Sequence, residues 1–217
     1  KTWNAHWISL KKRRSFIGNF LELFRKQIIS RAVSFYFDKY FGKEGTFIEA
    51  GSGSSQTSLR IKKLKRKIIA VDISEEALKE AKKVKIVDET KLADIRKMPF
   101  KKNSIDGVWN LGVMEHFEEK EDVKIIDQFY ELLKKDGKVI LFWPPDYALY
   151  RSITVPFEFV MKTLFGRKDF VVFPNEINRI HSKTHLMSIL KKTKFKKYKI
   201  HFNARDAYTH YVVVLFK

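Results

Sequence analysis

The stretch FIEAGSGSSQTS, residues 47–58, decides the fold because it changes from strand-forming to small residues within a few positions. Its apolar start suits a buried strand, Glu49 closes that strand, and Gly51 and Gly53 come next in a turn with little side chain. Glycines let a backbone lie close to a ligand, and amides at the start of a helix can face its polar groups. The stretch alone predicts either a plain turn or a binding site, and the other segments of the sequence are needed to distinguish the two.

Strands and helices are expected to alternate on both sides of this stretch. Apolar periodicity and turn residues predict strands at 45–50, 67–74, 84–90, 104–112 and 138–145, and helices at 55–65, 74–83 and 120–137. A helix at 183–195 and two antiparallel strands at 196–204 and 207–217 complete the pattern. The expected fold class is α/β, a doubly wound Rossmann-like, mostly parallel seven-stranded sheet.

Two segments fall outside this alternation. Residues 16–41 place apolar side chains at helical spacing, so residues 1–44 are expected to form an N-terminal helical extension of a single domain at 45–217. Residues 146–181 are rich in aromatic side chains, contain two prolines and show no βαβ unit. We expect this second segment to be an insertion after the fifth strand.

The amino-acid composition limits the kinds of partner and chemistry that we expect for this protein. Lysine and arginine number 44 against 25 acidic residues, a formal net charge of +19, which favours an anionic partner such as nucleic acid, a membrane surface or a phosphorylated substrate. A lysine-biased source explains the same numbers equally well. The absence of cysteine excludes disulfides, thiolate metal sites and a cysteine nucleophile. No apolar run suits a membrane span or a signal peptide, so we expect a cytoplasmic protein.

An acidic residue at nucleoside-binding distance favours the binding site over the plain turn. Asp72 ends the second predicted strand 21 residues after Gly51, close to the spacing at which a carboxylate accepts hydrogen bonds from ribose hydroxyls. The alternative is that Asp72 belongs to a cluster of acidic residues that caps the start of the next helix. Ser55 stands where a dinucleotide fingerprint has its third glycine, and no phosphate-binding lysine is present after it, so an NAD site is the weaker interpretation.

Four segments together resemble a known family. IEAGSGSS, VDIS, ADIRKMPFKKNSIDGVWNLGVMEHF and LLKKDGKVILFWPP run in the order and spacing typical of class I S-adenosylmethionine-dependent methyltransferases, and are most similar to the type 11 subgroup. The resemblance covers about residues 45–145. It implies S-adenosylmethionine as cofactor and S-adenosylhomocysteine as product, and an enzyme of the general class EC 2.1.1.

The resemblance also implies roles for individual residues. The methionine portion of the cofactor would lie against Glu49, Gly51, Gly53, Asn110 and Leu111, the ribose against Asp72, and the adenine against Ile73, Asp94 and Ile95. Glu115 and His116 would stand at the mouth of the site, and residues 146–181 would form the acceptor lid.

Methyl transfer is a displacement that needs positioning and, for some acceptors, a base. His116 and His181 are the candidate bases because imidazole titrates near neutrality, although either can instead complete a turn or cap a helix. Aromatic residues in 146–181 favour a small-molecule or lipid-like acceptor, or else form a satellite core. The alternatives are an RNA methyltransferase and a non-catalytic basic module that binds nucleic acid or an anionic membrane; no metal is expected.

Overall fold

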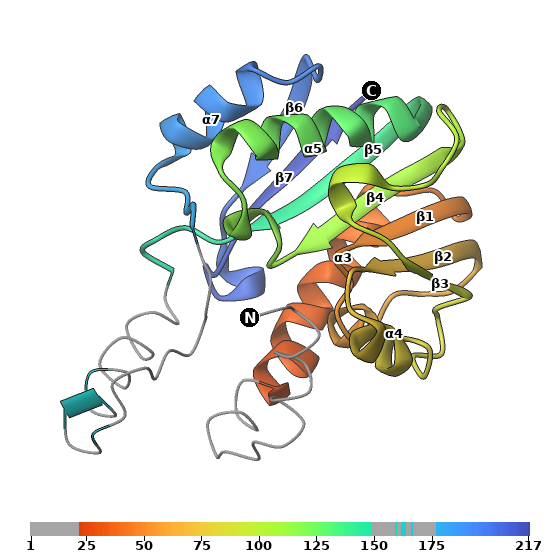
Figure 1. Cartoon of the computed structure of the whole chain (residues 1–217), viewed down its shortest axis with the longest axis horizontal. Coiled ribbons are helices and arrows are strands. Elements are labelled where there is room, and N and C mark those ends of the chain that lie inside the picture. The colour runs from red at the N-terminus through yellow and green to blue at the C-terminus, as the bar shows by residue number, and fades with distance from the viewer. Residues whose placement is uncertain (1–21, 149–158, 160–161, 164–165, 167–176) are drawn as a thin grey trace.

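The computed structural model describes residues 22–148, 159, 162–163, 166 and 177–217, and its centre is one seven-stranded sheet with strand order β3-β2-β1-β4-β5-β7-β6 (Figure 1). The first five strands pair in parallel, and β7 runs antiparallel between β5 and β6. This confirms the predicted doubly wound sheet with its antiparallel C-terminal pair. The strands are β1 Glu44–Ala50, β2 Lys65–Asp72, β3 Glu89–Leu92, β4 Ile105–Leu111, β5 Leu133–Trp143, β6 Lys197–His201 and β7 Tyr211–Phe216.

Helices cover both faces of the sheet. α5 and α7 pack on one face, and α3 and α4 lie on the other (Figure 1). Short 3-10 turns lie in several of the connections that leave the strands. The helical elements are η1 Arg25–Ile29, α3 Ser30–Tyr40, η2 Gln56–Ser58, α4 Glu75–Ala81, η3 Ile95–Lys97, η4 Met114–His116, α5 Glu119–Leu132, α7 Lys183–Lys191 and η5 Ala204–Asp206.

The N-terminal helix forms part of the core. Val33, Tyr36 and Phe37 of α3 are buried in one cluster with Trp109 of β4 and Phe142 of β5. Burial of such large side chains stabilises a fold by about 1.5–3 kcal/mol each. α3 therefore supplies one layer of the domain, while residues 1–21, which include the basic start of the predicted extension, lie outside the described residues.

Side-chain caps fix where two of the helices begin. The Ser74 hydroxyl accepts a hydrogen bond from the N–H of Ala77 and caps α4. Glu118 and Glu121 form a reciprocal capping box at the start of α5. Both helix starts lie just after segments that leave the carboxyl edge of the sheet, so the caps also set the length of the loops there.

The helix predicted at 55–65 is wrong. Only η2 forms, because Ser55 adopts a left-handed conformation (φ 53°) and the Ser58 side chain bonds to Glu49. The strand predicted at 84–90 is also misplaced. Val84 and Ile86 are buried against the α3 face in a turn, and β3 begins at Glu89.

The third difference concerns the end of α5. We predicted that this helix stops at Gly137, but it ends at Leu132, and Asp136 takes the left-handed conformation (φ 66°) within the irregular start of β5. Leu133 already pairs with Ile105, and the register shift before the next pair absorbs the intervening residues. Within the described part of the chain, no helix is long and apolar enough to cross a membrane.

Candidate functional site at the carboxyl edge of the sheet

The glycine turn lies between the ends of two neighbouring strands. β1 pairs with β2 up to Ala50 and Val71, and the N–H groups of Gly51 and Ser52 both donate to the Val71 carbonyl at 2.8 and 2.9 Å. Gly51 has φ +69°, and a Cβ there would lie 2.6 Å from Cγ2 of Val113. Only glycine fits this position without strain, so the bare backbone that the sequence predicted is a requirement of the packing.

Asp72 holds the glycine turn in place. Its Oδ2 accepts from the Gly53 N–H and its Oδ1 accepts from the Ser74 N–H, both at 2.8 Å. Burial raises the pKa of Asp72 above its usual value, and these backbone donors oppose that shift. An ionised carboxylate has about four acceptor positions, so Asp72 retains capacity for further donors such as two ribose hydroxyls.

Glu49 is buried at the end of β1. Its Oε1 accepts from the Ser58 hydroxyl at 2.6 Å, whereas Oε2 makes no hydrogen bond of good geometry with the described residues, although the polar atoms of Ser55 and Trp109 lie near the carboxylate. Burial raises the pKa of Glu49 to about 7, although the hydrogen bond from Ser58 opposes the change. A buried carboxylate oxygen without a partner is costly, which is the condition in which a ligand donor binds favourably.

Asn110 presents a second set of unpaired atoms at the end of β4. Its side chain is fully buried, and neither its amide nitrogen nor its amide oxygen has a partner in the described part of the chain. Leaving such groups unpaired costs about 1–3 kcal/mol each. Glu49 pairs in register with Trp109, and successive strand residues face opposite ways, so Glu49 and Asn110 lie on opposite faces of the same edge.

The residues expected around adenine differ in exposure. Ile73 comes directly after β2 and is 50% exposed, whereas Ile95 is buried in the core beneath α5. Asp94 caps η3, and its hydrogen bonds from the Arg96 side chain hold the pKa of Asp94 below its usual value. Ile73 and Asp94 therefore present surface to a ligand, whereas Ile95 packs into the core beneath η3.

The candidate bases are held by different elements. His116 is half-buried in η4, while His181 lies just before α7 with an exposed side chain. The Nδ1 atom of His181 is 2.6 Å from Oδ2 of Asp146, and its ring stacks on His185 with centroids 5.0 Å apart. Sequence reasoning missed Asp146, although its position directly after the two prolines that end β5 was a usable signal.

Backbone contacts bring the His181 segment to the carboxyl edge. Ile177 and Asn178 donate their N–H groups to the Glu115 carbonyl at 2.7 and 3.0 Å, and the Ile180 carbonyl accepts from Asp146. Asn178 also donates to Asp122, a buried carboxyl of α5. These contacts fix the last residues of the predicted insertion beside η4 and the end of β5.

The expected acceptor lid is described only in part. Among its aromatic side chains, Tyr147 hydrogen-bonds through its hydroxyl to Tyr211 and packs edge-on against Phe202, and Phe159 is exposed. The remaining aromatic side chains of the segment lie outside the described residues, namely Tyr150, Phe157, Phe165, Phe170 and Phe173, as do the basic side chains Arg151, Arg167 and Lys168. No group of His, Asp or Glu residues that could hold a metal occurs within the described ranges.

Comparison with known proteins identifies the domain. Residues 48–141 match the family model described as "Methyltransferase domain", the type 11 group. This match covers less than half of the chain, and it confirms the predicted resemblance to class I S-adenosylmethionine-dependent methyltransferases and, at the level of the matched domain, the predicted cofactor. No curated protein matches the chain at a significant level.

Solved structures share the fold at low identity. A SAM-dependent methyltransferase from Archaeoglobus fulgidus is 18% identical over 94% of this chain and 100% of that one, with a TM-score of 0.67. The magnesium protoporphyrin IX methyltransferase of Synechocystis PCC 6803 with bound SAH is 17% identical over 99% of this chain and 96% of that one, with a TM-score of 0.66. A "possible exported protein" of Bordetella parapertussis is 13% identical over 87% of this chain, with a TM-score of 0.64. This chain spans 65% of the length of that protein. These likenesses support the fold.

Proposed function

We propose that this chain is an S-adenosylmethionine-dependent methyltransferase whose cofactor binds over the carboxyl ends of β1, β2 and β4. The observation that carries the proposal is a pair of buried polar side chains, Glu49 and Asn110, that flank the glycine turn within the matched domain. Oε2 of Glu49 and both polar atoms of the Asn110 amide have no hydrogen-bond partner among the described residues. Polar groups in this state fit the amine and carboxylate of a methionine chain. The edge also lacks a lysine-bearing phosphate loop, which suits a cofactor without phosphate.

Each residue's proposed role depends on the strand end at which it lies. Glu49, Gly51, Gly53, Asn110 and Leu111 contact the methionine portion, Asp72 accepts from the ribose diol, and Ile73, Asp94 and Ile95 define the adenine end. Asp72 contributes twice in this scheme, because the carboxylate that binds ribose also holds the Gly53 N–H that shapes the turn. Binding and loop geometry are therefore coupled through one side chain.

The bound cofactor supplies an electrophilic methyl group that an acceptor atom takes by in-line displacement. The chain's contribution is to position the two reactants, to exclude water and to remove a proton where the acceptor carries one. For that last step we propose His181, with Asp146 as its positioning residue. A carboxylate on Nδ1 fixes the tautomer so that Nε2 is the free base. His116 is the second candidate, supported by its place in the turn after β4.

The acceptor is proposed to be a small or lipid-like molecule. Tyr147, Phe202, Tyr208 and Tyr211 form a connected aromatic group beyond the end of β5, with Tyr147 and Tyr208 about half exposed. Aromatic walls of this kind suit an apolar or ring-bearing molecule. The charge of +19 favours the alternative of a nucleic-acid acceptor or a non-catalytic basic module.

Methyl transfer from tritiated S-adenosylmethionine into fractionated cell extract separates these cases. The proposal predicts label in the small-molecule or lipid fraction, and loss of that label for the variant His181→Gln. Label confined to the nucleic-acid fraction supports the nucleic-acid methyltransferase. If the folded protein binds the cofactor and labels no fraction, the catalytic proposal is rejected in favour of the binding module.

A further inference from the structure

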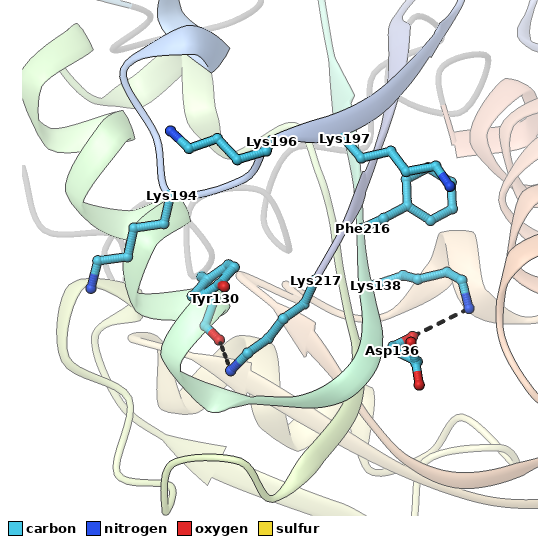
Figure 2. A pocket seen from close by; sticks show the side chains of 8 residues that line it. All are labelled: Tyr130, Asp136, Lys138, Lys194, Lys196, Lys197, Phe216 and Lys217. Carbon is cyan, nitrogen blue, oxygen red and sulfur yellow. Dashed lines mark hydrogen bonds between the residues drawn. The ribbon is translucent and has the colours of Figure 1, made fainter.

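A lysine-lined pocket lies at the end of the sheet opposite to the cofactor edge. It has a volume of about 430 Å³ and is formed where β5 begins, β7 ends and the edge strand β6 starts (Figure 2). Five of its lining side chains are lysines, namely Lys138, Lys194, Lys196, Lys197 and Lys217. The rings of Tyr130 and Phe216 complete its walls, so the pocket combines positive charge with aromatic surface.

Most of this positive charge has no carboxylate partner among the described residues. Lys194 pairs with Glu131, but the described part of the chain gives Lys138, Lys196 and Lys197 no ion pair. Lys217 Nζ donates to three neutral oxygens, of Asn103, Tyr130 and Leu133, at 2.7–2.9 Å. Among the described residues that line the pocket, the sole acidic side chain is Asp136. Uncompensated charge of one sign in a concave site attracts an anion more strongly than the same charge on a flat surface.

The positive surface continues from the pocket along β6. Lys197 and Lys199 lie two positions apart on that strand, and their ammonium groups are 5.6 and 6.0 Å from the centre of the Phe216 ring. Lys138, Phe216 and Lys197 stand in one row across three neighbouring strands. Residues 183–217 contain eight lysines and one arginine against a single acidic residue, so the charge is concentrated in this part of the chain.

Protection of the sheet edge explains only part of this pattern. Lysines on an edge strand prevent pairing with other chains, which accounts for Lys197 and Lys199. Lys138 is on an interior strand, and Lys196 and Lys217 lie beyond the strand ends, so they have no such role. Their presence around one pocket requires another explanation.

The surroundings favour nucleic acid over a membrane as the anionic partner. A membrane-binding surface presents large apolar side chains for insertion beside its cations. None of the exposed large apolar side chains of the described residues lies in the pocket or on β6. A partly buried ring flanked by amines is instead the arrangement that stacks a base and pairs its phosphates.

We propose that the pocket and the adjoining β6 edge bind a single-stranded nucleic acid, with phosphates on Lys138, Lys196, Lys197 and Lys199 and a base against Phe216. Five residue steps of β5 separate Lys138 from Trp143 at the cofactor edge, roughly 17 Å of strand. The surface is therefore a docking site separate from the methyl-transfer site, and it does not depend on the proposed enzymatic function.

The test measures binding of labelled single-stranded RNA and DNA of about 12 nucleotides by fluorescence anisotropy, between about 50 and about 200 mM salt. The triple variant Lys138→Gln, Lys197→Gln and Lys199→Gln removes three cations from the proposed surface. Its matched control, Lys82→Gln, Lys85→Gln and Lys91→Gln, removes three exposed lysines near β3, the opposite edge of the sheet. Circular dichroism checks that both variants are folded.

We expect the first triple variant to weaken binding at least about 10-fold and to reduce the salt slope by about 2, since each phosphate contact on a single strand contributes about 0.7. The control should change affinity less than about 3-fold. Phe216→Leu, which keeps an apolar side chain, should weaken binding without changing the salt slope. Equal losses in both triple variants, no binding at the lower salt, or binding to anionic vesicles alone would overturn the proposal.

Discussion

The N–H of Gly53 donates to Oδ2 of Asp72 at 2.8 Å, so the end of β2 determines the shape of the turn after β1. The variant Asp72→Asn turns an amide group toward one of two backbone donors, Gly53 or Ser74, and leaves that donor unpaired. We expect it to lower the free energy of unfolding by about 1–3 kcal/mol and to weaken S-adenosylhomocysteine binding at least about 10-fold. Urea unfolding and calorimetric titration measure the two effects.

Asp106 provides the matched control for that variant. Its Oδ2 also accepts a backbone N–H, from Thr46, at 2.8 Å, but it lies at the amino ends of β1 and β4. Asp106→Asn should lower stability in the same way and leave cofactor affinity unchanged. An equal loss of affinity in both variants would mean that Asp72 acts through stability alone.

Gly51 and Val113 are predicted to be coupled. In Gly51→Ala the new methyl group meets Cγ2 of Val113 at 2.6 Å and the backbone keeps φ +69°, so we expect a loss of about 2–4 kcal/mol in unfolding free energy. Val113→Ala removes the clashing methyl groups. The double variant should therefore lose less than the sum of the single variants, by at least about 0.5 kcal/mol, and strict additivity would contradict this packing.

Asp122 makes stability depend on pH. Burial raises the pKa of Asp122 to about 8, against an ordinary value of 3.8. The unfolded chain loses this proton near pH 4 whereas the folded chain retains it, so the contribution of Asp122 is fully present below about pH 4 and is lost as the pH rises to about 8.

The variant Asp122→Asn removes this dependence and keeps an oxygen that accepts from Asn178. Its unfolding free energy relative to the original protein should increase by at least about 1 kcal/mol between pH 5 and pH 8. Urea unfolding at the two pH values measures the difference. A constant difference across that range would show that Asp122 titrates normally in the folded chain.

The Asp146–His181 pair is predicted to act on transfer and not on cofactor binding. Once a labelled acceptor fraction is known, His181→Gln should lower the transfer rate by about 10²–10⁴-fold, the usual contribution of a general base. Asp146→Asn should lower kcat less, with little change in the affinity for S-adenosylmethionine. His185→Gln, which removes the stacked ring and the Nδ1 that accepts the His181 N–H but keeps the contact between Asp146 and His181, is the control. An unchanged rate in His181→Gln would assign the base to another residue, with His116 tested next.

The sequence was informative where a residue type has one physical use. Gly51 and Asp72 were predicted at strand ends because a bare backbone and a carboxylate at that spacing are rarely interchangeable with other residues, and the structure has both at the same edge. The apolar run around Val84 misled the strand prediction because burial against a helix face and burial in a sheet require the same side chains.

Long-range pairings were not predictable in this way. The bonds from Ser58 to Glu49 and from His181 to Asp146 depend on how the chain returns to the carboxyl edge, and residue spacing carries no such information. Ser55 shows the same limit: its left-handed φ of 53° is a conformation that glycine adopts more readily, so its residue type offered no reason to expect it.

Calorimetric titration of S-adenosylhomocysteine into the protein and two single-site variants tests the cofactor site most directly. Ile73 is 50% exposed just after β2, and Leu64 is 53% exposed just before β2, so Ile73→Asp and Leu64→Asp introduce the same charge at opposite ends of one strand. The proposed site predicts binding to the original protein and to Leu64→Asp, and at least about 10-fold weaker binding to Ile73→Asp. No binding to the folded original protein, or equal binding to both variants, would contradict it.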